Sequence, residues 1–323
     1  MKNLTMISVI TCLGSILAAV VSCDECERST DCDPGEVCLD GTCEQAEPFS
    51  MDSDTDTDSD TDADSDTDTD DPFALDWIEI PGGSYMMGGD ELTEAETPVH
   101  QVDITTFEMT RSEVTAGQYA RCFNEGTCTA PETGDRMTWE VAVKVHHPAN
   151  GVTWFQANDF CVWAGGRLPS ESEWEYAACS GGKNLKYPWG DADPSCDYCI
   201  MDEEEGSQGC GTGGTDAVCT ISAGNTEEGL CDMAGNVYEW TMDTWHPTYD
   251  GAPTNGSAWI DGTTADWVIR GGGFQSGPEI RLLQTRGRLP YVTSEPDLGF
   301  RCARGGGGTD VDAGPDDGGA SFL

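Results

Sequence analysis

Short runs in which apolar and polar residues alternate predict strands near the start of the folded region. Trp77–Ile80 is followed by Pro81-Gly82-Gly83, and His100–Ile104 alternates in the same way, so both stretches indicate short strands ended by turns. Thr115 is a typical helix N-cap, and the residues after it predict a helix over 116–123. The secondary-structure signals are therefore mixed.

Apolar residues recur with a helical period between Trp154 and Ala164, which predicts a second helix. A third helix is expected after Ser170, because Ser170 and Glu173 have the spacing of a capping box. After Ala178 the chain is rich in glycine and shows little periodicity. Few short helices, short strands and long loops predict an irregular, loop-rich α+β domain stapled by disulfides.

The N-terminal residues carry export signals. Lys2 precedes an apolar run over residues 4–21, which predicts a secretory signal peptide over residues 1–22. The run ends in Val20-Val21-Ser22-Cys23, which resembles a bacterial lipobox, so we expect Cys23 to carry a lipid that anchors the protein to a membrane. Cleavage without lipid, with Cys23 in a disulfide, is the alternative.

A small cysteine-rich module is predicted over residues 23–47. It carries four cysteines between positions 26 and 43, and a stretch this short cannot bury a core, so disulfides must stabilise it. Three connectivities exist, and we favour the interleaved pairs Cys26–Cys38 and Cys32–Cys43.

The rest of the chain divides by composition. A Ser/Thr/Asp repeat predicts an acidic, disordered linker over residues 48–71, because its like charges repel and nothing apolar can be buried. All ten tryptophans fall within residues 72–304, the predicted globular domain. The Gly- and Asp-rich residues 305–323 predict a disordered tail.

Charge and cysteine content limit the partners and the location. The formal net charge of −45 argues against nucleic acid or anionic lipid as an electrostatic partner and favours cation binding. Sixteen cysteines indicate an oxidising compartment. We therefore expect an exported monomer of the cell envelope or surface that meets the membrane through its lipid only.

The stretch 229–240, GLCDMAGNVYEW, combines candidate metal ligands with a turn. Asp232 and Glu239 lie on either side of Gly235 and Asn236, and a tight loop with such oxygen donors suits a hard cation such as calcium. An ordinary turn before a buried strand is the alternative.

A series of motifs in this order resembles the sulfatase-modifying-factor family, whose founding activity is that of the formylglycine-generating enzyme. The motifs are IPGGSYMMG (80–88), ETPVH (96–100), SEVT (112–115), VTW (152–154), CVWAGGRLPSESEWEYA (161–177), YPWG (187–190), the stretch 229–240, RGGGF (270–274) and GFRC (299–302). The resemblance covers residues 77–304 and implies a variant of the C-type-lectin-like fold.

The resemblance also implies a calcium site and a disulfide. The family's ligands correspond to the side chains of Asp232 and Glu239 and to the backbone carbonyls of Gly235 and Val237. A second calcium site is expected within residues 197–216, without assigned ligands. A family disulfide corresponds to the pair Cys161–Cys302.

The sequence departs from the family pattern at the catalytic centre. The family enzyme oxidises a substrate cysteine to formylglycine with copper(I) held by two cysteines, and their positions correspond to Ser276 and Arg281 here. Soft thiolates select copper(I), which a hydroxyl and a guanidinium cannot replace. The sequence has no cysteine between Cys231 and Cys302, so we expect no bound copper and assign no catalytic residue.

The remaining cysteines suggest further bridges. Cys122 and Cys128 are close enough in sequence for a local disulfide. For the other six cysteines between positions 179 and 231 we favour Cys219–Cys231, Cys196–Cys210 and Cys179–Cys199, with a redox role for Cys196 and Cys199 as the weaker alternative.

Three other groups of polar residues have plain structural explanations. Glu171, Glu173 and Glu175 are expected on an exposed helix face. Surface or structural positions account for His100, His146, His147 and His246. Arg270, Arg281, Arg286 and Arg288, with Trp240, form either an anion-binding site or a set of ion pairs.

Three functions remain open. We favour a non-catalytic module that binds a protein or a glycan and is displayed from a membrane on the acidic linker. A diverged oxidoreductase of the family, acting on protein cysteine or another substrate, and a purely structural surface protein are the alternatives.

Overall fold

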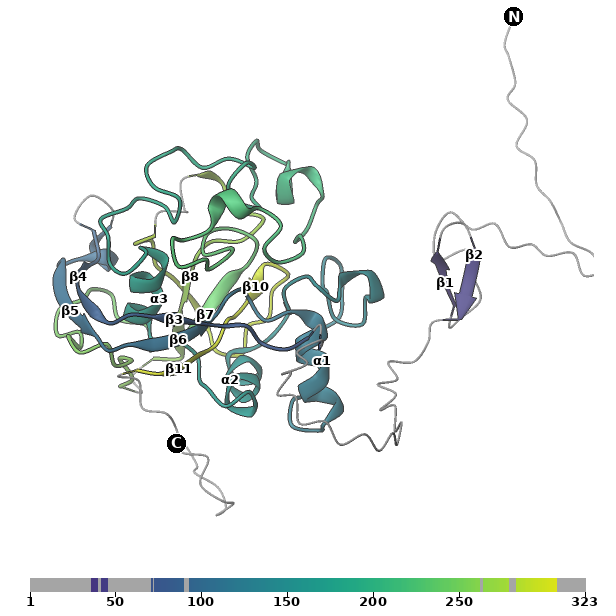
Figure 1. Cartoon of the computed structure of the whole chain (residues 1–323), viewed down its shortest axis with the longest axis horizontal. Coiled ribbons are helices and arrows are strands. Elements are labelled where there is room, and N and C mark those ends of the chain that lie inside the picture. Colours follow the sequence, from purple (N-terminus) through teal and green to yellow (C-terminus); the bar gives the residue numbers. More distant parts are fainter. Residues whose placement is uncertain are drawn as a thin grey trace, which may run out of the picture. The chain divides into compact units, whose positions relative to one another are not determined.

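The computed structural model describes residues 36–39, 42–45, 71, 73–89, 93–261, 264–278 and 283–306, which belong to two units, residues 1–67 and 68–323 (Figure 1). In the first unit, β1 (Glu36–Leu39) and β2 (Thr42–Gln45) form an antiparallel hairpin with Cys38 opposite Cys43. Cys23, Cys26 and Cys32 lie outside the described residues. The lipid anchor and the pairs Cys26–Cys38 and Cys32–Cys43 therefore stay predictions.

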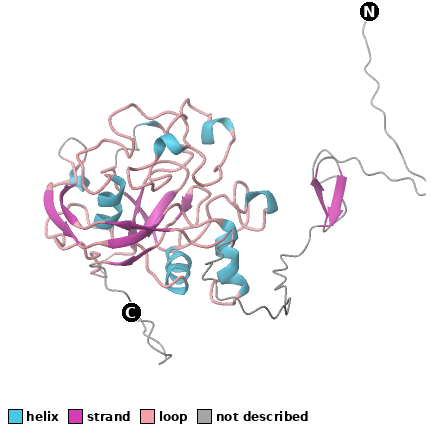
Figure 2. Ribbon diagram, in the orientation of Figure 1, coloured by secondary structure: helices cyan, strands magenta, loops and turns pink. Residues whose placement is uncertain are grey.

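The described residues of the second unit form mostly loops, with short strands and three α-helices among them (Figure 2). Its strands are β3 (Trp77–Ile80), β4 (Gly83–Met87), β5 (His100–Ile104), β6 (Phe107–Thr110), β7 (Tyr238–Thr244), β8 (Asp266–Arg270), β9 (Gly287–Pro290), β10 (Leu298–Gly299) and β11 (Ala303–Gly305). Its helices are α1 (Ala116–Asn124), α2 (Trp154–Trp163) and α3 (Glu171–Ala178), with 3₁₀ turns η2 (Glu94–Glu96), η3 (Ala142–Lys144), η4 (Gln208–Gly211) and η5 (Ser222–Gly224). This is the predicted loop-rich α+β fold.

Three small sheets connect distant parts of the domain. The largest has the strand order β10-β7-β8-β9, in which β10 and β7 run parallel and the other pairs antiparallel. A second sheet, β11-β6-β3, joins the last described strand to the first strands of the domain, and β4 pairs with β5. Helix α3 packs against β4 and β5 (Figure 1).

The three α-helices begin where the sequence predicts, because each has a local capping signal. The side chains of Thr115, Thr153 and Ser170 each accept a hydrogen bond from the backbone N–H three residues on. In return, the side chain of the third helical residue accepts a hydrogen bond from the backbone N–H of the N-cap residue. The strands over 77–80 and 100–104 are likewise confirmed. These elements depend on neighbours in the sequence, which is why local patterns reveal them.

Two apolar clusters fill the domain. One lies between α3 and the strands β4, β5 and β6, around Trp174 and Tyr85. The other gathers Tyr119, Phe160 and Phe300 with Trp240, between α1, α2 and the large sheet. The disulfide Cys161–Cys302 lies in the second cluster and joins α2 to the end of the chain, across 141 positions of sequence.

The described residues contain four disulfides: Cys122–Cys128, Cys161–Cys302, Cys196–Cys210 and Cys219–Cys231. The expected pair Cys179–Cys199 is wrong, because Cys179 is a free, buried thiol at the C-cap of α3. Cys199 packs instead with its sulfur 3.6 Å from that of Met201. Four disulfides indicate an oxidising location. No helix in the described part of the chain is long and apolar enough to cross a membrane.

Candidate functional site

The stretch 229–240 forms a tight loop that leads into β7. Its backbone has positive φ at Asp232 (55°), Gly235 (89°) and Asn236 (59°). Gly235 must remain a glycine, because a Cβ there would lie 2.5 Å from the carbonyl oxygen of Ile200. The Gly235 N–H donates to the carbonyl oxygen of Gly271 at 3.0 Å, which fixes the loop against the RGGGF motif.

Asp232 is buried beside a disulfide of this loop. Its Oδ2 accepts a hydrogen bond from the backbone N–H of Cys219 at 2.6 Å, and Cys219 is bonded to Cys231. Burial raises the pKa of Asp232 to about 6, even though this hydrogen bond and the charge of Arg301 lower it. The negative charge of Asp232 is therefore only partly compensated in the structure.

Glu239 is the partner of a buried arginine. Nε and Nη2 of Arg301 each lie 2.7 Å from one carboxylate oxygen of Glu239, a bidentate arrangement. The indole Nε1 of Trp174 donates to the same carboxylate at 2.7 Å. The side chains of Arg301 and Glu239 are both completely buried, so this ion pair lies inside the domain between β7 and the GFRC motif.

Glu113 is a third carboxyl group at this place, and sequence reasoning assigns it no role. Its Oε2 accepts from Nδ2 of Asn236 at 3.1 Å, and its Oε1 accepts from the Val237 N–H at 3.4 Å. Burial, together with the charges of Asp232 and Glu239, raises its pKa well above the usual value. Its place in the SEVT motif was the one available signal, because it lies more than 100 residues from the loop it supports.

The donor set can be tested for its fit to calcium. Among the residues that the structure describes, no group of three or more His, Cys, Asp or Glu is arranged to hold a metal ion. An ion in this loop would need backbone carbonyls as well, which calcium accepts. Both oxygens of Glu239 already accept from Arg301, whereas Asp232 carries a poorly compensated charge. Of the two carboxylates, Asp232 is therefore the one whose charge is left for a cation.

Ser276 occupies the position where the resemblance places a copper thiolate. Its buried Oγ accepts from the Gly273 N–H at 3.1 Å and lies 3.2 Å from the hydroxyl oxygen of Tyr238. Arg281, the second position, lies outside the described residues. A hydroxyl group already held by hydrogen bonds is not a soft ligand, so Ser276 does not fit copper(I).

The glutamates of α3 are buried, which corrects the expectation of an exposed helix face. Glu171, Glu173 and Glu175 are each at most 3% exposed. Glu173 faces Arg167 with oxygen–nitrogen distances of 2.7 and 2.8 Å. Their local sequence alone suggests an exposed helix face, but their arginine partners make burial possible.

Two of the clustered arginines neutralise these glutamates. Arg270 contacts Glu175 at 2.5 Å and Glu171 at 3.1 Å, while Arg286 contacts both oxygens of Glu171 at 2.6 and 2.9 Å. Burial opposes ionisation of Glu171, but Arg286 and Arg270 bring its pKa below the usual value. Of the two interpretations for this arginine cluster, the structure supports ion pairs for Arg270 and Arg286.

The histidine side chains form no ion pair with these glutamates, although the backbone carbonyl of His246 accepts a hydrogen bond from Nη1 of Arg286 at 3.0 Å. His146 stacks on Phe73, and Nδ1 of His147 lies 3.0 Å from the hydroxyl of Thr215. His246 stacks on Trp259 at 3.5 Å between ring centroids, and its Nε2 lies 2.9 Å from Asp261. Each has a packing role in the described residues.

A comparison with protein families decides the classification. The model of the sulfatase-modifying factor enzyme 1-like domain matches residues 62–305, three quarters of the chain. The chain belongs to this family. The match includes the 229–240 loop, the buried ion pairs and the position of Ser276.

Proteins similar to this chain carry very different names. The chain is 29% identical to the serine/threonine-protein kinase pkn1 of Chlamydia caviae over 72% of its own length, but spans only 38% of that relative. It is 26% identical to the formylglycine-generating enzyme of Mycobacterium tuberculosis, with 70% and 96% of the two chains covered. It is equally 26% identical to the inactive C-alpha-formylglycine-generating enzyme 2 of Bos taurus, with 72% and 89% covered.

A solved structure agrees with this family. PvdO from Pseudomonas aeruginosa superimposes with a TM-score of 0.62 at 26% identity, covering 72% of this chain and 95% of PvdO. The domain thus has the loop-rich C-type-lectin-like fold of the formylglycine-generating enzyme family.

Proposed function

We propose that this chain is an exported, lipid-anchored protein whose domain is a non-catalytic binding module for a protein or a glycan. The proposal depends mainly on Ser276. At the position of a copper thiolate, the chain has a buried hydroxyl that is hydrogen-bonded to Gly273 and Tyr238. Oxidation of a cysteine by this family requires the copper that such a site cannot hold.

Two further facts support a domain without reactive thiols. Eight cysteines of the described domain are in disulfides, and burial raises the pKa of the Cys179 thiol, which keeps it in the unreactive form. The family also contains proteins named as inactive, such as the relative from Bos taurus. A family fold therefore carries no enzymatic activity by itself.

Export and anchoring are supported by the N-terminal sequence. The apolar run after Lys2 and the lipobox-like residues before Cys23 would place the protein at a membrane surface, and four disulfides suit an oxidising compartment. The acidic linker would then hold the domain away from the lipid.

A competition experiment tests the missing copper site. The purified full chain is titrated with copper(I) buffered by a chromogenic chelator, beside the formylglycine-generating enzyme of Mycobacterium tuberculosis. We expect this chain to take no copper from the chelator while the enzyme does. One equivalent of copper(I) held as tightly as in the enzyme would refute the proposal.

Calcium in the 229–240 loop is a second part of the proposal. Asp232, with the carbonyls of Gly235 and Val237, would bind the ion, which would lower the pKa of Asp232 and hold the loop closed. Chelation should lower the melting temperature of the wild type but not that of Asp232→Asn. An unchanged wild-type melting temperature on chelation would remove calcium from the account.

A further inference from the structure

The sequence contains two Asn-Gly dipeptides, Asn150-Gly151 and Asn255-Gly256, and the fold places them in opposite surroundings. In an Asn-Gly dipeptide the backbone nitrogen of the glycine can attack the side-chain amide of the asparagine, because glycine has no side chain to hinder the approach. Both glycines have a positive φ, 66° at Gly151 and 80° at Gly256. Since the glycine conformations are similar, the surroundings decide which amide can react.

Asn150 is locked in the interior of the domain. It is completely buried, and its Oδ1 accepts hydrogen bonds from the backbone N–H and from Oγ1 of Thr138, at 2.8 and 3.0 Å. Its Nδ2 donates to two backbone carbonyl oxygens. The N–H of Gly151, which would be the attacking group, donates to the carbonyl oxygen of Glu295 at 3.1 Å. The amide and its nucleophile are therefore both held in hydrogen bonds, away from water.

Asn255 is exposed, at a bend in the segment between β7 and β8. Its Oδ1 accepts two hydrogen bonds from Ser257, from Oγ at 2.7 Å and from the backbone N–H at 3.3 Å. This Asx turn folds the side-chain amide forward over the Gly256 peptide. Among the described residues, no hydrogen bond engages the Gly256 N–H. The attacking nitrogen is thus uncommitted, and it lies beside an amide whose carbonyl group is polarised by two donors.

We propose that Asn255 is a site of spontaneous succinimide formation, at which the backbone nitrogen of Gly256 attacks Cγ of Asn255, whereas Asn150 stays an amide. The attack forms the bond between this nitrogen and Cγ and breaks the Cγ–Nδ2 bond, and the proton of the Gly256 N–H leaves with Nδ2 as ammonia. Water then adds to one of the two ring carbonyls and opens the ring to aspartate or to isoaspartate. Nothing is oxidised or reduced, and water is the one co-reactant. The donors of Ser257 bind the oxygen on which negative charge develops during the attack, an arrangement that stabilises such an intermediate.

Isoaspartate at this position would alter a segment that holds two elements of the domain. The carbonyl oxygen of Thr254 accepts a hydrogen bond from the N–H of Asp103 in β5 at 2.9 Å. The carbonyl oxygen of Gly256 accepts from Oγ of Ser170, the N-cap of α3, at 2.8 Å. Isoaspartate inserts an extra methylene into the backbone between these two contacts, so they cannot both keep their present geometry. The modification would therefore loosen the segment from the start of α3, and it goes beyond the binding-module function without depending on it.

The test is ageing of the full chain in mildly alkaline buffer at physiological temperature, followed by peptide mapping with mass spectrometry and an assay for isoaspartate. Peptides that contain Asn255 should accumulate aspartate and isoaspartate with release of ammonia, while peptides that contain Asn150 should keep the amide. Asn150 is the internal control, because denaturant removes both environments. In the unfolded chain the two dipeptides should lose their amides at similar rates.

Two surface variants test the geometry and its consequence. Ser257→Ala removes the shorter hydrogen bond to Oδ1 but keeps the Asn-Gly dipeptide, so the amide of Asn255 should be lost several-fold more slowly. Asn255→Gln does not close the ring readily and should keep its melting temperature during ageing. The aged, isoaspartate-containing wild type should melt at a lower temperature than the fresh protein. Melting temperatures before ageing show that each variant is folded.

Three outcomes would overturn the proposal. The first is an intact amide at Asn255 in the folded chain after an ageing time that converts it in the unfolded chain. The second is equal loss of the amides of Asn150 and Asn255 in the folded chain. The third is loss in Ser257→Ala as fast as in the wild type. An unchanged melting temperature of the isoaspartate form would refute the loosening at α3.

Discussion

Replacing Glu239 by glutamine tests the role of the buried ion pair in the 229–240 loop. Glutamine keeps the shape of the side chain but leaves the guanidinium of Arg301 without its bidentate partner. Loss of one partner of a buried pair typically costs about 3–5 kcal/mol of the free energy of unfolding. Asp232 and Glu113 also interact with Arg301, which places the expected value near the lower end of that range.

The expected loss is large enough for a simple assay. For a domain of this size, about 3–5 kcal/mol corresponds to a fall in melting temperature of roughly 6–20 °C. Calorimetry and denaturant unfolding of the full chain under oxidising conditions would measure it, once with calcium and once with a chelator. Asp266→Asn is the control, because it breaks a 3.6 Å contact with the exposed Arg288 and should change stability by less than about 1 kcal/mol.

The chelator distinguishes the two possible roles of Glu239. If the ion pair is its role, the loss caused by Glu239→Gln persists without calcium. A loss that disappears in the chelator would make Glu239 a calcium ligand after all. A loss no larger than that of Asp266→Asn under both conditions would refute the reasoning about the buried pair.

Three further predictions follow from single contacts. Burial and the neighbouring Glu171 raise the pKa of Asp243 from 3.8 to about 7, so its contribution to stability is complete below about pH 4 and lost as the pH rises to 7. The free energy of unfolding should therefore fall more steeply across this pH range in the wild type than in Asp243→Asn, and equal slopes would contradict the assignment. The double variant Cys161→Ala/Cys302→Ala removes a disulfide of sequence separation 141 and should lower the free energy of unfolding by up to about 5 kcal/mol. Removing Cys122–Cys128, with separation 6, should lower it by about 2 kcal/mol. Equal losses in denaturant unfolding would argue against an entropic origin of the difference. The buried Cys179 should be alkylated only after unfolding, which peptide mapping by mass spectrometry can measure, and rapid labelling of the native chain would show that its burial is wrong.

Local signals predicted the helices and strands well, because their causes lie within a few residues. Thr115, Thr153 and Ser170 are N-caps that act on the backbone three positions ahead. His100–Ile104 likewise alternates between inward and outward side chains, and in Trp77–Ile80 the exposed Glu79 lies between the half-buried Ile78 and the buried Ile80. The loops in between have no such period, so their paths follow from sheets and bridges that join distant residues.

The errors arose where distant partners decide the outcome. The polar pattern around Glu171 and Glu175 predicts a surface position, but Arg270 and Arg286, about 100 residues later, allow both glutamates to be buried. Counting cysteines predicts the pair Cys179–Cys199, whereas the fold places Cys179 in the apolar cluster beside α3. Glu113 was missed for the same reason, since the loop that it supports lies far away in sequence.

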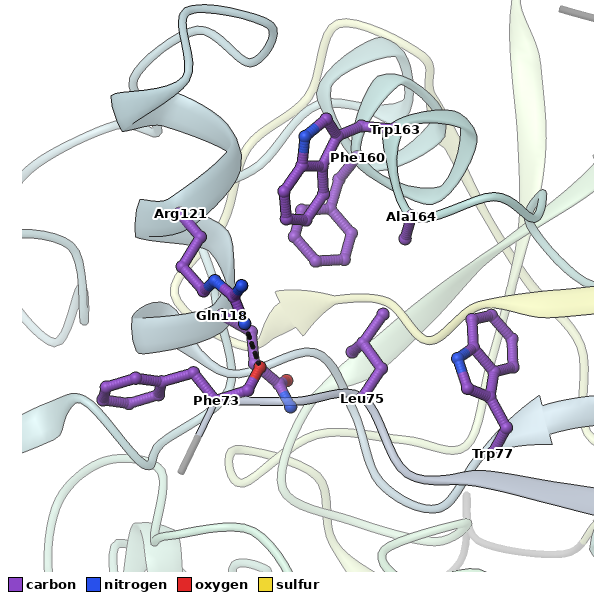
Figure 3. A pocket seen from close by; sticks show the side chains of 8 residues that line it. All are labelled: Phe73, Leu75, Trp77, Gln118, Arg121, Phe160, Trp163 and Ala164. Atoms are coloured by element: carbon purple, nitrogen blue, oxygen red, sulfur yellow. Dashed lines mark hydrogen bonds between the residues drawn. The ribbon is translucent and has the colours of Figure 1, made fainter. Parts of the chain in front are cut away.

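The candidate site was only partly accessible to sequence reasoning. The position of Ser276 was found through the resemblance, and its hydrogen bonds to Gly273 and Tyr238 come from the structure alone. The hollow between α1, α2 and the segment before β3 has no sequence motif at all (Figure 3). Its walls come from three separate segments that only the folded chain brings together.

The most direct test of the central claim is cysteine oxidation itself. The full chain, supplied with copper(I), oxygen and a sulfatase-type cysteine peptide, is compared by mass spectrometry and aldehyde labelling with the formylglycine-generating enzyme of Mycobacterium tuberculosis. The account predicts an unchanged peptide with this chain and an aldehyde with the enzyme. A copper-dependent aldehyde formed by this chain would contradict the claim that the domain is a non-catalytic binding module.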